Sequence, residues 1–441
     1  MKIHKLLYIA FILLLTLGCE DFLEESPVDS ITDRTAITDR ESAESVIAAL
    51  YELYPGRPAF ILAAMSDEQN DVPGDSEFTL NAVQPTTGGI TGVWNQSWEL
   101  IYRANNIIQE IPRVEKLTSE QINQFVAEAK SLRALQYLVH LIPFFGDVPW
   151  IESTDIEVLR KISRIPKNEV LNNIISDLLE AELHLPDEYD TEAKTRTRIT
   201  RGAAKAILAR AYLYQENWQG AENKATEVIN NRLYELQTNY EDVFTPNSKE
   251  SIFELWSDAF TNQGIAQSFF PESLDGRYAY APTVKIQNAF EPGDLRKATA
   301  LNTDDNGLVY IFKYRDITAS GDLQEKKELR LAEMYLIRAE ARARQNKLAE
   351  AQEDLNIIRN RAGLPNTSAS NQNDLLLAIE QERFVELCFE GHRWADLIRT
   401  KRVDAVMSEF NPNWNPRAKL LPLPQAELDL NPNLRPQNPG Y

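Results

Sequence analysis

Two segments of this chain carry the residue types that recognise sugars. Aromatic faces stack on the apolar C–H surfaces of sugar rings, while carboxylates, amides and guanidinium groups hydrogen-bond to hydroxyls. Glycine and proline interrupt both segments, Asp67–Phe78 and Phe269–Tyr280, and this predicts loops in which so many aromatic residues are hard to bury completely. The candidate ligand contacts are Asp67, Asn70, Asp71, Asp75, Phe78, Phe269, Arg277, Tyr278 and Tyr280. For each residue, packing of the loop onto the body of the protein remains an equal alternative.

A second set of charged residues resembles a catalytic pair. Glu386 and Glu390 are four residues apart, so on a helix they share one face, and Arg393 follows them. Apolar and aromatic neighbours such as Phe389 and Trp394 favour a buried ion-pair network over general acid–base chemistry. We therefore predict no catalytic residue here.

Several weaker patterns suggest metal or cofactor sites without completing them. Asn302, Asp304, Asn306 and Gly307 imitate the opening of a calcium loop, but the twelfth position, which needs a bidentate Glu, is Lys313. A turn is the better interpretation. No serine elbow, phosphate-binding loop or dinucleotide glycine motif occurs. The sequence predicts neither a metal ion nor a cofactor.

Tryptophan and histidine residues in the helical segments are predicted mainly to pack in the interior. Trp94 and Trp98 are four residues apart and share a helix face, which favours the core over sugar stacking. Trp218 and Trp394 are also predicted in the core, and His140 and His392 are predicted to pack within apolar helical surroundings.

Composition limits the function classes. The 441 residues include 46 Lys or Arg and 66 Asp or Glu, for a net charge of −20 and a pI near 4.8. Binding to a phosphate backbone needs a clustered cationic surface, so we expect no nucleic-acid partner. Two Cys and four His cannot build a disulfide framework and make a zinc architecture improbable.

The N-terminus has the pattern of a lipoprotein leader. Lys2 and Lys5 precede an uncharged run from Leu6 to Leu17, which is too short to span a hydrocarbon core and fits a signal peptide over residues 1–18. Gly18-Cys19 resembles the bacterial lipobox, although Thr16 stands where Leu is usual. We predict lipidation at Cys19, with the lipid as the membrane anchor; cleavage changes the net charge from −20 to −22.

Most of the chain between the two ends is predicted to form amphipathic helices. Apolar residues recur with a spacing near 3.6, and Thr118 with Gln121 has the pattern of a capping box. Short strands or extended loops are predicted at Ser251–Trp256 and Val309–Tyr314. The predicted helices are Glu41–Tyr54, Trp94–Ile111, Ser119–Leu141, Lys167–Leu183, Arg201–Gln215, Trp218–Asn231, Glu328–Gln345, Leu348–Arg361, Leu375–Phe389 and Arg393–Val406.

Two predicted helix pairs repeat with an offset of 130 residues. Ala209, Trp218, Ala221, Ala225 and Val228 correspond to Ala339, Leu348, Ala351, Leu355 and Ile358. This is the spacing of a tetratricopeptide helical hairpin, in which small residues allow close helix approach. Residues 233–323 do not repeat, so we predict an array that carries a large irregular insertion. Generic packing of alanine-rich helices is the alternative.

The C-terminal segment is rich in proline. Seven of the 22 prolines lie between Asn411 and Tyr441, and this density excludes helix and strand interiors. A disordered tail is one interpretation. The apolar residues within it favour an extended segment packed on the domain: Trp414, Leu420, Leu421, Leu423 and Leu430.

Taken in order, motifs along nearly the whole chain resemble the SusD/RagB family of outer-membrane lipoproteins of Bacteroidota. The resemblance rests on Cys19-Glu20-Asp21-Phe22-Leu23 with Pro27, Trp98-x3-Tyr102-x2-Ala104-Asn105-Asn106-Ile107-Ile108, Arg133-Ala134-x2-Tyr137, Phe145-Gly146-Asp147-Val148-Pro149, Arg201-Gly202-Ala203-Ala204-Lys205-Ala206, Leu329-Arg330-Leu331-Ala332-Glu333-Met334-Tyr335, Ala339-Glu340-Ala341, Asn356-x2-Arg359-x-Arg361-Ala362-Gly363-Leu364, Glu382-Arg383-x2-Glu386-Leu387-x-Phe389-Glu390-Gly391-x-Arg393, Asp396-Leu397 and Gln437-Asn438-Pro439-Gly440-Tyr441.

This resemblance implies a mainly α, tetratricopeptide-like fold and a nutrient-binding lipoprotein on the outer face of the outer membrane. Such a protein caps a SusC-like TonB-dependent transporter and traps an oligosaccharide, or in some members a peptide, without catalysis. The implied organisation is a tether at 19–40, a helical region at 41–232, a ligand-facing insertion at 233–323 and a C-terminal region at 324–441. A glycan-active enzyme using Asp67, Asp71 or Asp75 and a peptide-binding scaffold remain alternatives.

Overall fold

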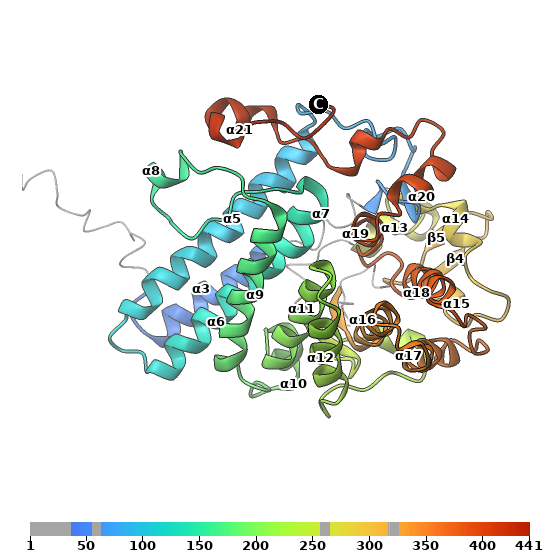
Figure 1. The fold of residues 1–441 in the computed structure, drawn as a ribbon, viewed down its shortest axis with the longest axis horizontal. Helices are drawn as coiled ribbons and strands as arrows, with labels where there is room; N and C mark the ends of the chain where they lie inside the picture. Colours follow the sequence, from blue (N-terminus) through green and yellow to red (C-terminus); the bar gives the residue numbers. More distant parts are fainter. Residues whose placement is uncertain (1–36, 55–62, 256–264, 316, 318–325) are drawn as a thin grey trace, which may run out of the picture.

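The computed structural model describes residues 37–54, 63–255, 265–315, 317 and 326–441. Helices dominate these residues, and Figure 1 shows them stacked side by side across the molecule with the C-terminal segment along one edge. The described strands form three two-stranded sheets, so the expected mainly helical fold with a few short strands is confirmed. The predicted signal peptide and Cys19 lie outside the described residues.

The N-terminal helices begin where the sequence supplies caps. Thr118 and Gln121 form the predicted capping box at the start of α6, with a Gln121 N–H to Thr118 Oγ1 distance of 3.2 Å. Helix α6 continues through a π turn, Tyr137–Leu141, into α7. The helices of this part are α3 (Arg40–Leu53), α5 (Gly88–Glu110), α6 (Ser119–Gln136), α7 (Ile142–Phe145), α8 (Ile156–Leu159), α9 (Lys167–His184) and α10 (Glu192–Thr197).

The two predicted hairpins form the centre of the array. Helices α11 (Arg201–Tyr214) and α12 (Trp218–Ile229) make the first, and α16 (Leu331–Arg344) and α17 (Leu348–Arg361) make the second. The small residues of the repeat are fully buried, and α12 packs directly against α16. The repeat therefore buries an alanine-lined contact between neighbouring helices, as its spacing predicted.

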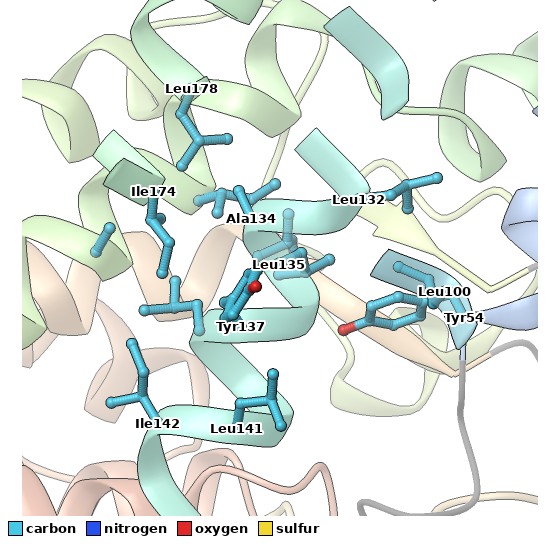
Figure 2. Packing of buried hydrophobic residues seen from close by; sticks show 14 of the residues in the cluster. Tyr54, Leu100, Leu132, Ala134, Leu135, Tyr137, Leu141, Ile142, Ile174 and Leu178 are labelled. Carbon is cyan, nitrogen blue, oxygen red and sulfur yellow. The ribbon is translucent and has the colours of Figure 1, made fainter. Parts of the chain in front are cut away.

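Apolar side chains from distant parts of the chain fill the core. Figure 2 shows Leu135, Tyr137 and Leu141, on and after α6, between Leu100 of α5 on one side and Ile174 of α9 on the other. Trp94 is buried and contacts Trp98 edge to face, with the two ring centroids 5.1 Å apart, whereas Trp98 is only partly buried. Trp394 is also in the core, but Trp218 is partly exposed at its edge.

Strand β2 (Ser251–Glu254) pairs with β6 (Lys327–Arg330), and this pairing corrects one expected helix boundary. We predicted a helix over Glu328–Gln345, but α16 begins at Leu331 because Glu328–Arg330 belongs to the buried strand. The remaining short elements are β1 (Gln69–Asp71), β3 (Tyr280–Pro282), β4 (Leu301–Thr303), β5 (Val309–Ile311), α13 (Ile265–Phe269), α14 (Val284–Gln287) and α15 (Lys297–Ala300).

The C-terminal part closes the array with α18 (Gln372–Glu386), α19 (Arg393–Arg399), α20 (Val403–Phe410) and α21 (Gln425–Leu430). The predicted single helix over Arg393–Val406 is wrong. The helix is interrupted between α19 and α20, where Lys401 has the left-handed φ of +61°. The tail packs on the domain as predicted: Leu421 and Leu423 are fully buried, and the Leu421 N–H donates to the Phe144 carbonyl at 2.6 Å. The expectation that proline excludes helix from this segment is wrong, because the six residues of α21 fit between Pro424 and Pro432. Leu430 differs, with 79% exposure. Within the described residues, every helix is too short or too polar to cross a bilayer.

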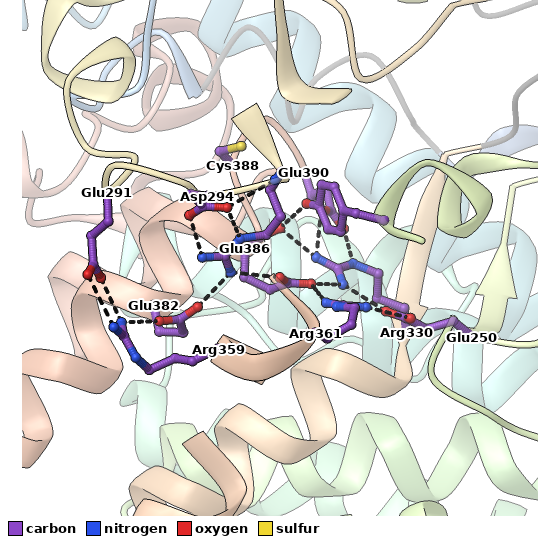
Figure 3. Close-up of polar contacts among 12 residues, drawn as sticks. Glu250, Glu291, Asp294, Arg330, Arg359, Arg361, Glu382, Glu386, Cys388 and Glu390 are labelled. Carbon is purple, nitrogen blue, oxygen red and sulfur yellow. Dashed lines mark hydrogen bonds and ion pairs between the residues drawn. The ribbon is translucent and has the colours of Figure 1, made fainter. Parts of the chain in front are cut away.

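A network of buried charges joins strand β6 to the second helical hairpin and to α18 (Figure 3). Arg330, in β6, bonds Glu386 at 2.6 Å, Glu390 at 2.7 Å and Glu250 at 3.0 Å. Arg361 also bonds Glu250 and Glu386. Helices α17 (Leu348–Arg361) and α18 (Gln372–Glu386), strand β6 and the turns at Glu250 and Glu390 thus meet around carboxylates that have almost no contact with water.

The network extends into residues 265–315. Arg296 bonds Glu382 at 2.6 Å and Glu386 at 2.9 Å, and Lys313 bonds Glu390 at 2.8 Å. Burial by itself would raise the pKa of Glu386, but Arg361, Arg330 and Arg296 hold it well below its ordinary value. The structural interpretation of Glu386 and Glu390 is confirmed, although Arg393 pairs elsewhere, with Asp67.

Replacing Glu386 by Ala should destabilise the fold strongly, because it leaves several buried cations without their shared anion. Removal of one partner from a buried ion pair costs about 3–5 kcal/mol. Chemical denaturation should show this loss in the free energy of unfolding. The exposed pair Lys401–Glu216, 3.8 Å apart, supplies the control: Lys401→Ala should change stability by less than about 1 kcal/mol. Equal effects of the two substitutions would contradict the proposed importance of the network.

Candidate ligand-binding surface

The two loops that the sequence singled out are joined by a sheet. Strands β1 and β3 pair antiparallel, with Asn70 opposite Ala281 and Asp71 opposite Tyr280. The Val72 N–H extends the ladder by donating to the Ala279 carbonyl at 3.0 Å. Segments about 200 residues apart in sequence therefore form one local structure, which we call the β1–β3 surface: residues 67–80 and 265–282.

Backbone hydrogen bonds fold the second loop tightly against α13. The Arg277 N–H donates to the Gln267 carbonyl at 2.7 Å, and the Tyr278 N–H donates to the Phe270 carbonyl at 2.8 Å. A Cβ atom on Gly276 would lie 1.9 Å from the Phe270 carbonyl oxygen, so only glycine allows this approach. Tyr278 itself has φ +44°. The loop thus presents Arg277 and Tyr278 from a constrained backbone.

Six of the nine candidate contacts reach the surface. Asp75 and Arg277 are exposed, and Asn70, Asp71, Tyr278 and Tyr280 are partly exposed. The Tyr278 hydroxyl donates to the Val309 carbonyl at 2.9 Å, which fixes the ring between the loop and β5. Burial, followed by the charge of Asp304, raises the pKa of Tyr278. The hydrogen bond to Val309 holds the partly exposed Tyr278 ring in one position, as stacking against a sugar requires.

The other three candidate contacts lie in the interior. Asp67 is fully buried and accepts from Arg393 Nε at 2.7 Å and Nη2 at 2.9 Å, with Lys285 Nζ at 3.1 Å. Burial would raise the pKa of Asp67, but these two cations lower it. Phe269 is fully buried beside Tyr314, and Phe78 is 8% exposed. We therefore exclude Asp67, Phe78 and Phe269 from direct ligand contact and assign them to positioning the loops.

Asp71 also shapes its own loop. Its Oδ1 accepts from Ser76 Oγ at 2.7 Å and from Thr79 Oγ1. These bonds close the turn that carries Asp75 outward.

The calcium-like motif is the turn between β4 and β5, as predicted. Asp304 Oδ1 accepts from the Asn306 N–H at 3.0 Å and the Leu308 N–H at 2.8 Å, and Gly307 has φ +85°. Ser273 Oγ donates to Asp304 Oδ2 at 2.7 Å, which attaches this turn to the β1–β3 surface. Lys313 is buried in the ion network.

Sequence reasoning missed a set of exposed apolar side chains on and beside the same loops. Isolated apolar residues in polar loops carry no periodic signal, and only the structure shows that they surround one surface. They are Val72, Leu80, Leu274, Val284 and Leu308, with exposed fractions of 41%, 45%, 38%, 71% and 40%. Such side chains are suited to contact the apolar faces of sugar rings.

A pocket of about 1030 Å³ lies elsewhere, between α7, α9, α19 and the C-terminal tail. None of its lining residues belongs to the β1–β3 surface. Arg164, which lines this pocket, donates hydrogen bonds to the Asp147 carbonyl at 2.8 Å and to the Pro436 carbonyl at 2.7 Å. The pocket has many polar lining residues but one aromatic residue, Tyr214, whereas the β1–β3 surface presents both Tyr278 and Tyr280. Size alone therefore does not make the pocket the better candidate for sugar stacking.

Comparison with known proteins identifies the family. Residues 212–441 match the family described as "SusD family", and residues 21–213 match one described as "Starch-binding associating with outer membrane". The first match alone covers more than half of the chain. This chain belongs to the SusD family. The resemblance found in the sequence motifs is confirmed.

Relatives of this SusD family protein extend over its full length. "SusD-like protein P2" of Formosa agariphila is 28% identical and aligns over 100% of both chains. A solved structure described as "Laminarin binding SusD-like protein" is 26% identical and covers 92% of this chain and 100% of its own, with a TM-score of 0.81. A SusD superfamily protein from Bacteroides vulgatus, 21% identical, covers 91% of this chain and 99% of its own with a TM-score of 0.82, which supports the fold.

Glu68, a buried residue of the segments that form the β1–β3 surface of this SusD family chain, has an unusual environment. It is 1% exposed, its Oε2 accepts from the Phe389 N–H at 3.3 Å, and its Oε1 is buried without a hydrogen-bond partner. Burial raises the pKa of Glu68 to about 8. The carboxyl group is therefore protonated in the folded protein at neutral pH.

This pKa predicts a loss of stability as pH rises. An unfolded Glu titrates near pH 4.3, so between about pH 4.5 and 8 the folded state binds more protons than the unfolded state, and its stability falls with pH. Glu68→Gln should remove this decline and raise the free energy of unfolding at pH 9 by roughly 3–4 kcal/mol relative to the native chain, with little difference at pH 5. Denaturation series at both pH values measure it. A parallel pH dependence in the two proteins would show that Glu68 ionises normally.

Gly276 provides a test of the loop geometry. Gly276→Ala forces a side chain against the Phe270 carbonyl, so hydrogen exchange at the Arg277, Tyr278 and Ala279 amides should accelerate by at least about tenfold. Gly92 lies in α5 with nothing within 4 Å of an added Cβ. Gly92→Ala should leave exchange in the loop unchanged and stabilise the helix by roughly 0.5–1 kcal/mol. Unchanged loop exchange in Gly276→Ala would refute the close approach.

Proposed function

We propose that this protein is a cell-surface lipoprotein that binds an oligosaccharide at the β1–β3 surface and delivers it to a SusC-like TonB-dependent transporter. The observation that carries the proposal is the meeting of two distant loops in one sheet. Together they present two tyrosine rings, an arginine and several carboxylate and amide groups, which is the mixture that sugar recognition requires.

The comparisons support a glycan as the ligand. One matching family is described as starch-binding and as associated with the outer membrane, and a relative of 26% identity is described as binding laminarin. Both descriptions concern glucans. They favour a polysaccharide or oligosaccharide over the peptide ligand that remained open from the sequence.

Anchorage and partner follow from the sequence and the family. The proposed mature chain begins at Cys19, which carries the lipid, and the following Glu20-Asp21-Phe22-Leu23-Glu24-Glu25 run is the proposed signal for the outer face of the membrane. The helical regions 41–232 and 324–441 would form the scaffold that faces the transporter, and the insertion 233–323 would contribute the ligand side. Lipid at Cys19 would be the contact with the membrane.

We further propose that binding proceeds without catalysis. Two of the carboxylates considered for an enzyme already have partners in the protein. Asp67 is ion-paired with Arg393 and Lys285, and Asp71 accepts a hydrogen bond from Ser76 in its own turn. Glu386 and Glu390 are locked in the buried network. A direct check is incubation of the purified mature domain with oligosaccharides; release of shorter products, lost in Asp71→Ala and Asp75→Ala variants, would favour the enzyme instead.

Substitution of the two tyrosines tests the site. Tyr278→Ala and Tyr280→Ala together should weaken binding of the best ligand from a neutral glycan panel by roughly ten- to hundredfold, because each ring supplies a stacking face. Isothermal titration calorimetry measures the change. Tyr102, partly exposed on α5, is the matched control, and Tyr102→Ala should leave affinity unchanged.

Tyr278→Phe separates stacking from packing. It keeps the ring but removes the bond to the Val309 carbonyl, so affinity should fall less than in Tyr278→Ala. Full binding by the double alanine variant would place the ligand elsewhere and favour a scaffold that binds peptides along its helices.

A further inference from the structure

We infer that the β1–β3 surface selects its ligand by charge, accepting uncharged oligosaccharides and rejecting those that carry carboxylate or sulfate groups. The inference rests on the proposed function, since it names the substrate class of the same surface. It depends on where the structure brings acidic side chains together, which net charge alone did not reveal.

Acidic side chains from three separate loops gather at this surface. The sheet joins residues 67–80 to residues 265–282, and the Ser273–Asp304 hydrogen bond of 2.7 Å attaches the turn between β4 and β5. Tyr278 touches the same hairpin through the Val309 carbonyl. Each of the following carboxylates is at least partly exposed: Asp71, Asp75, Glu77, Glu272, Asp275, Asp304 and Asp305.

Positive charge is scarce in the same three segments. Among residues 67–80, 265–282 and 301–311, Arg277 is the one Lys or Arg. Lys285 follows β3 closely, but its Nζ lies 3.1 Å from the buried Asp67 carboxylate and offsets that charge. Seven surface carboxylates therefore face a single guanidinium group.

These carboxylates do not converge on a cation. In the part of the chain that the structure describes, no three Asp, Glu, His or Cys side chains are placed to hold a metal ion. Asp71 and Asp304 already accept hydrogen bonds from their own turns. The negative charge is thus open to the solution in which a ligand arrives.

The consequence differs sharply between classes of glycan. The hydroxyls of a neutral sugar donate hydrogen bonds to carboxylates, whereas an ionised carboxylate or sulfate group on a sugar has no hydrogen to donate and is repelled. With six net negative charges about 10 Å away and a screening length near 8–10 Å, each anionic group on the ligand should weaken binding roughly fivefold. Added salt should relieve this repulsion, while leaving neutral binding almost unchanged.

The experiment compares one oligosaccharide in two charge states. The best-binding member of a panel of neutral oligosaccharides is titrated calorimetrically, alongside the same molecule with its C6 hydroxyls oxidised to carboxylates, at 20 mM and 300 mM salt. We expect the oxidised form to bind at least tenfold more weakly at low salt and to recover affinity at high salt, whereas the neutral form should change by less than about twofold.

A charge variant separates repulsion from lost contacts. Glu77→Gln, Glu272→Gln and Asp305→Asn together remove three charges at residues that are not among the candidate contacts, so oxidised-ligand affinity should rise at least about threefold while neutral affinity holds. The control removes the same charge far away, through Glu115→Gln, Glu120→Gln and Glu353→Gln, and should have no effect.

The possible failures are distinguishable. Equal or tighter binding of the oxidised form, or a panel in which sulfated or uronate glycans are the binders, would overturn charge selection and leave glycan binding intact. Absence of binding to every glycan, neutral and acidic, would overturn the proposed function and the inference with it. A gain in oxidised-ligand affinity equal in both triple variants would show that overall charge, and not this surface, is responsible.

Discussion

The ion pairs of Glu386 and Glu390 with Arg330 and Lys313 determine how the rest of this molecule is arranged. Withdrawing charges from water is costly, and the cost is recovered only when every donor and acceptor meets a partner with good geometry. Here the partners come from the insertion, from strand β6 and from α17 and α18 (Figure 3). These segments must therefore assemble together, since any one of them alone would bury an uncompensated charge.

The β1–β3 surface owes its position to this network. Lys313 lies just after β5 and is bonded to Glu390, while Arg393, three residues beyond Glu390, holds Asp67 just before β1. Residue Asp67 of the β1–β3 surface and strand β5, to which Tyr278 is hydrogen-bonded, are thus attached to one short stretch of the chain, Glu386–Arg393. The helical hairpins supply the rigid body to which this stretch belongs, and the loops can carry polar and aromatic side chains outward without losing their orientation.

Local patterns predicted the helices, the buried alanines of the repeat and the turn at Asp304, because helix periodicity, small-residue spacing and turn chemistry are encoded within a few residues. Two of the errors share a long-range cause, whereas the break between α19 and α20 at Lys401 is local. Asp67 looks like a sugar-binding carboxylate in its polar loop, but its partner Arg393 is 326 residues away. Lys327–Arg330 continues a helical pattern, yet pairing with β2 makes it a strand. The union of the two loops in one sheet was likewise invisible, as three-residue strands leave no periodic signal.

Pairing in the interior also explains where the surplus negative charge of the protein must go. Among the described residues, the buried side chains include fifteen Asp or Glu and eleven Lys or Arg, close to balance, and Glu68 is neutral at physiological pH. An interior of low polarity tolerates little net charge, so most of the excess of 20 acids is left for the surface. Part of this excess lies in the seven carboxylates around the loops with aromatic side chains, of which Asp71 and Asp304 also close their own turns. A surface of this kind loses nothing with uncharged sugars, whose hydroxyls donate to carboxylates, and it penalises each anionic group that approaches.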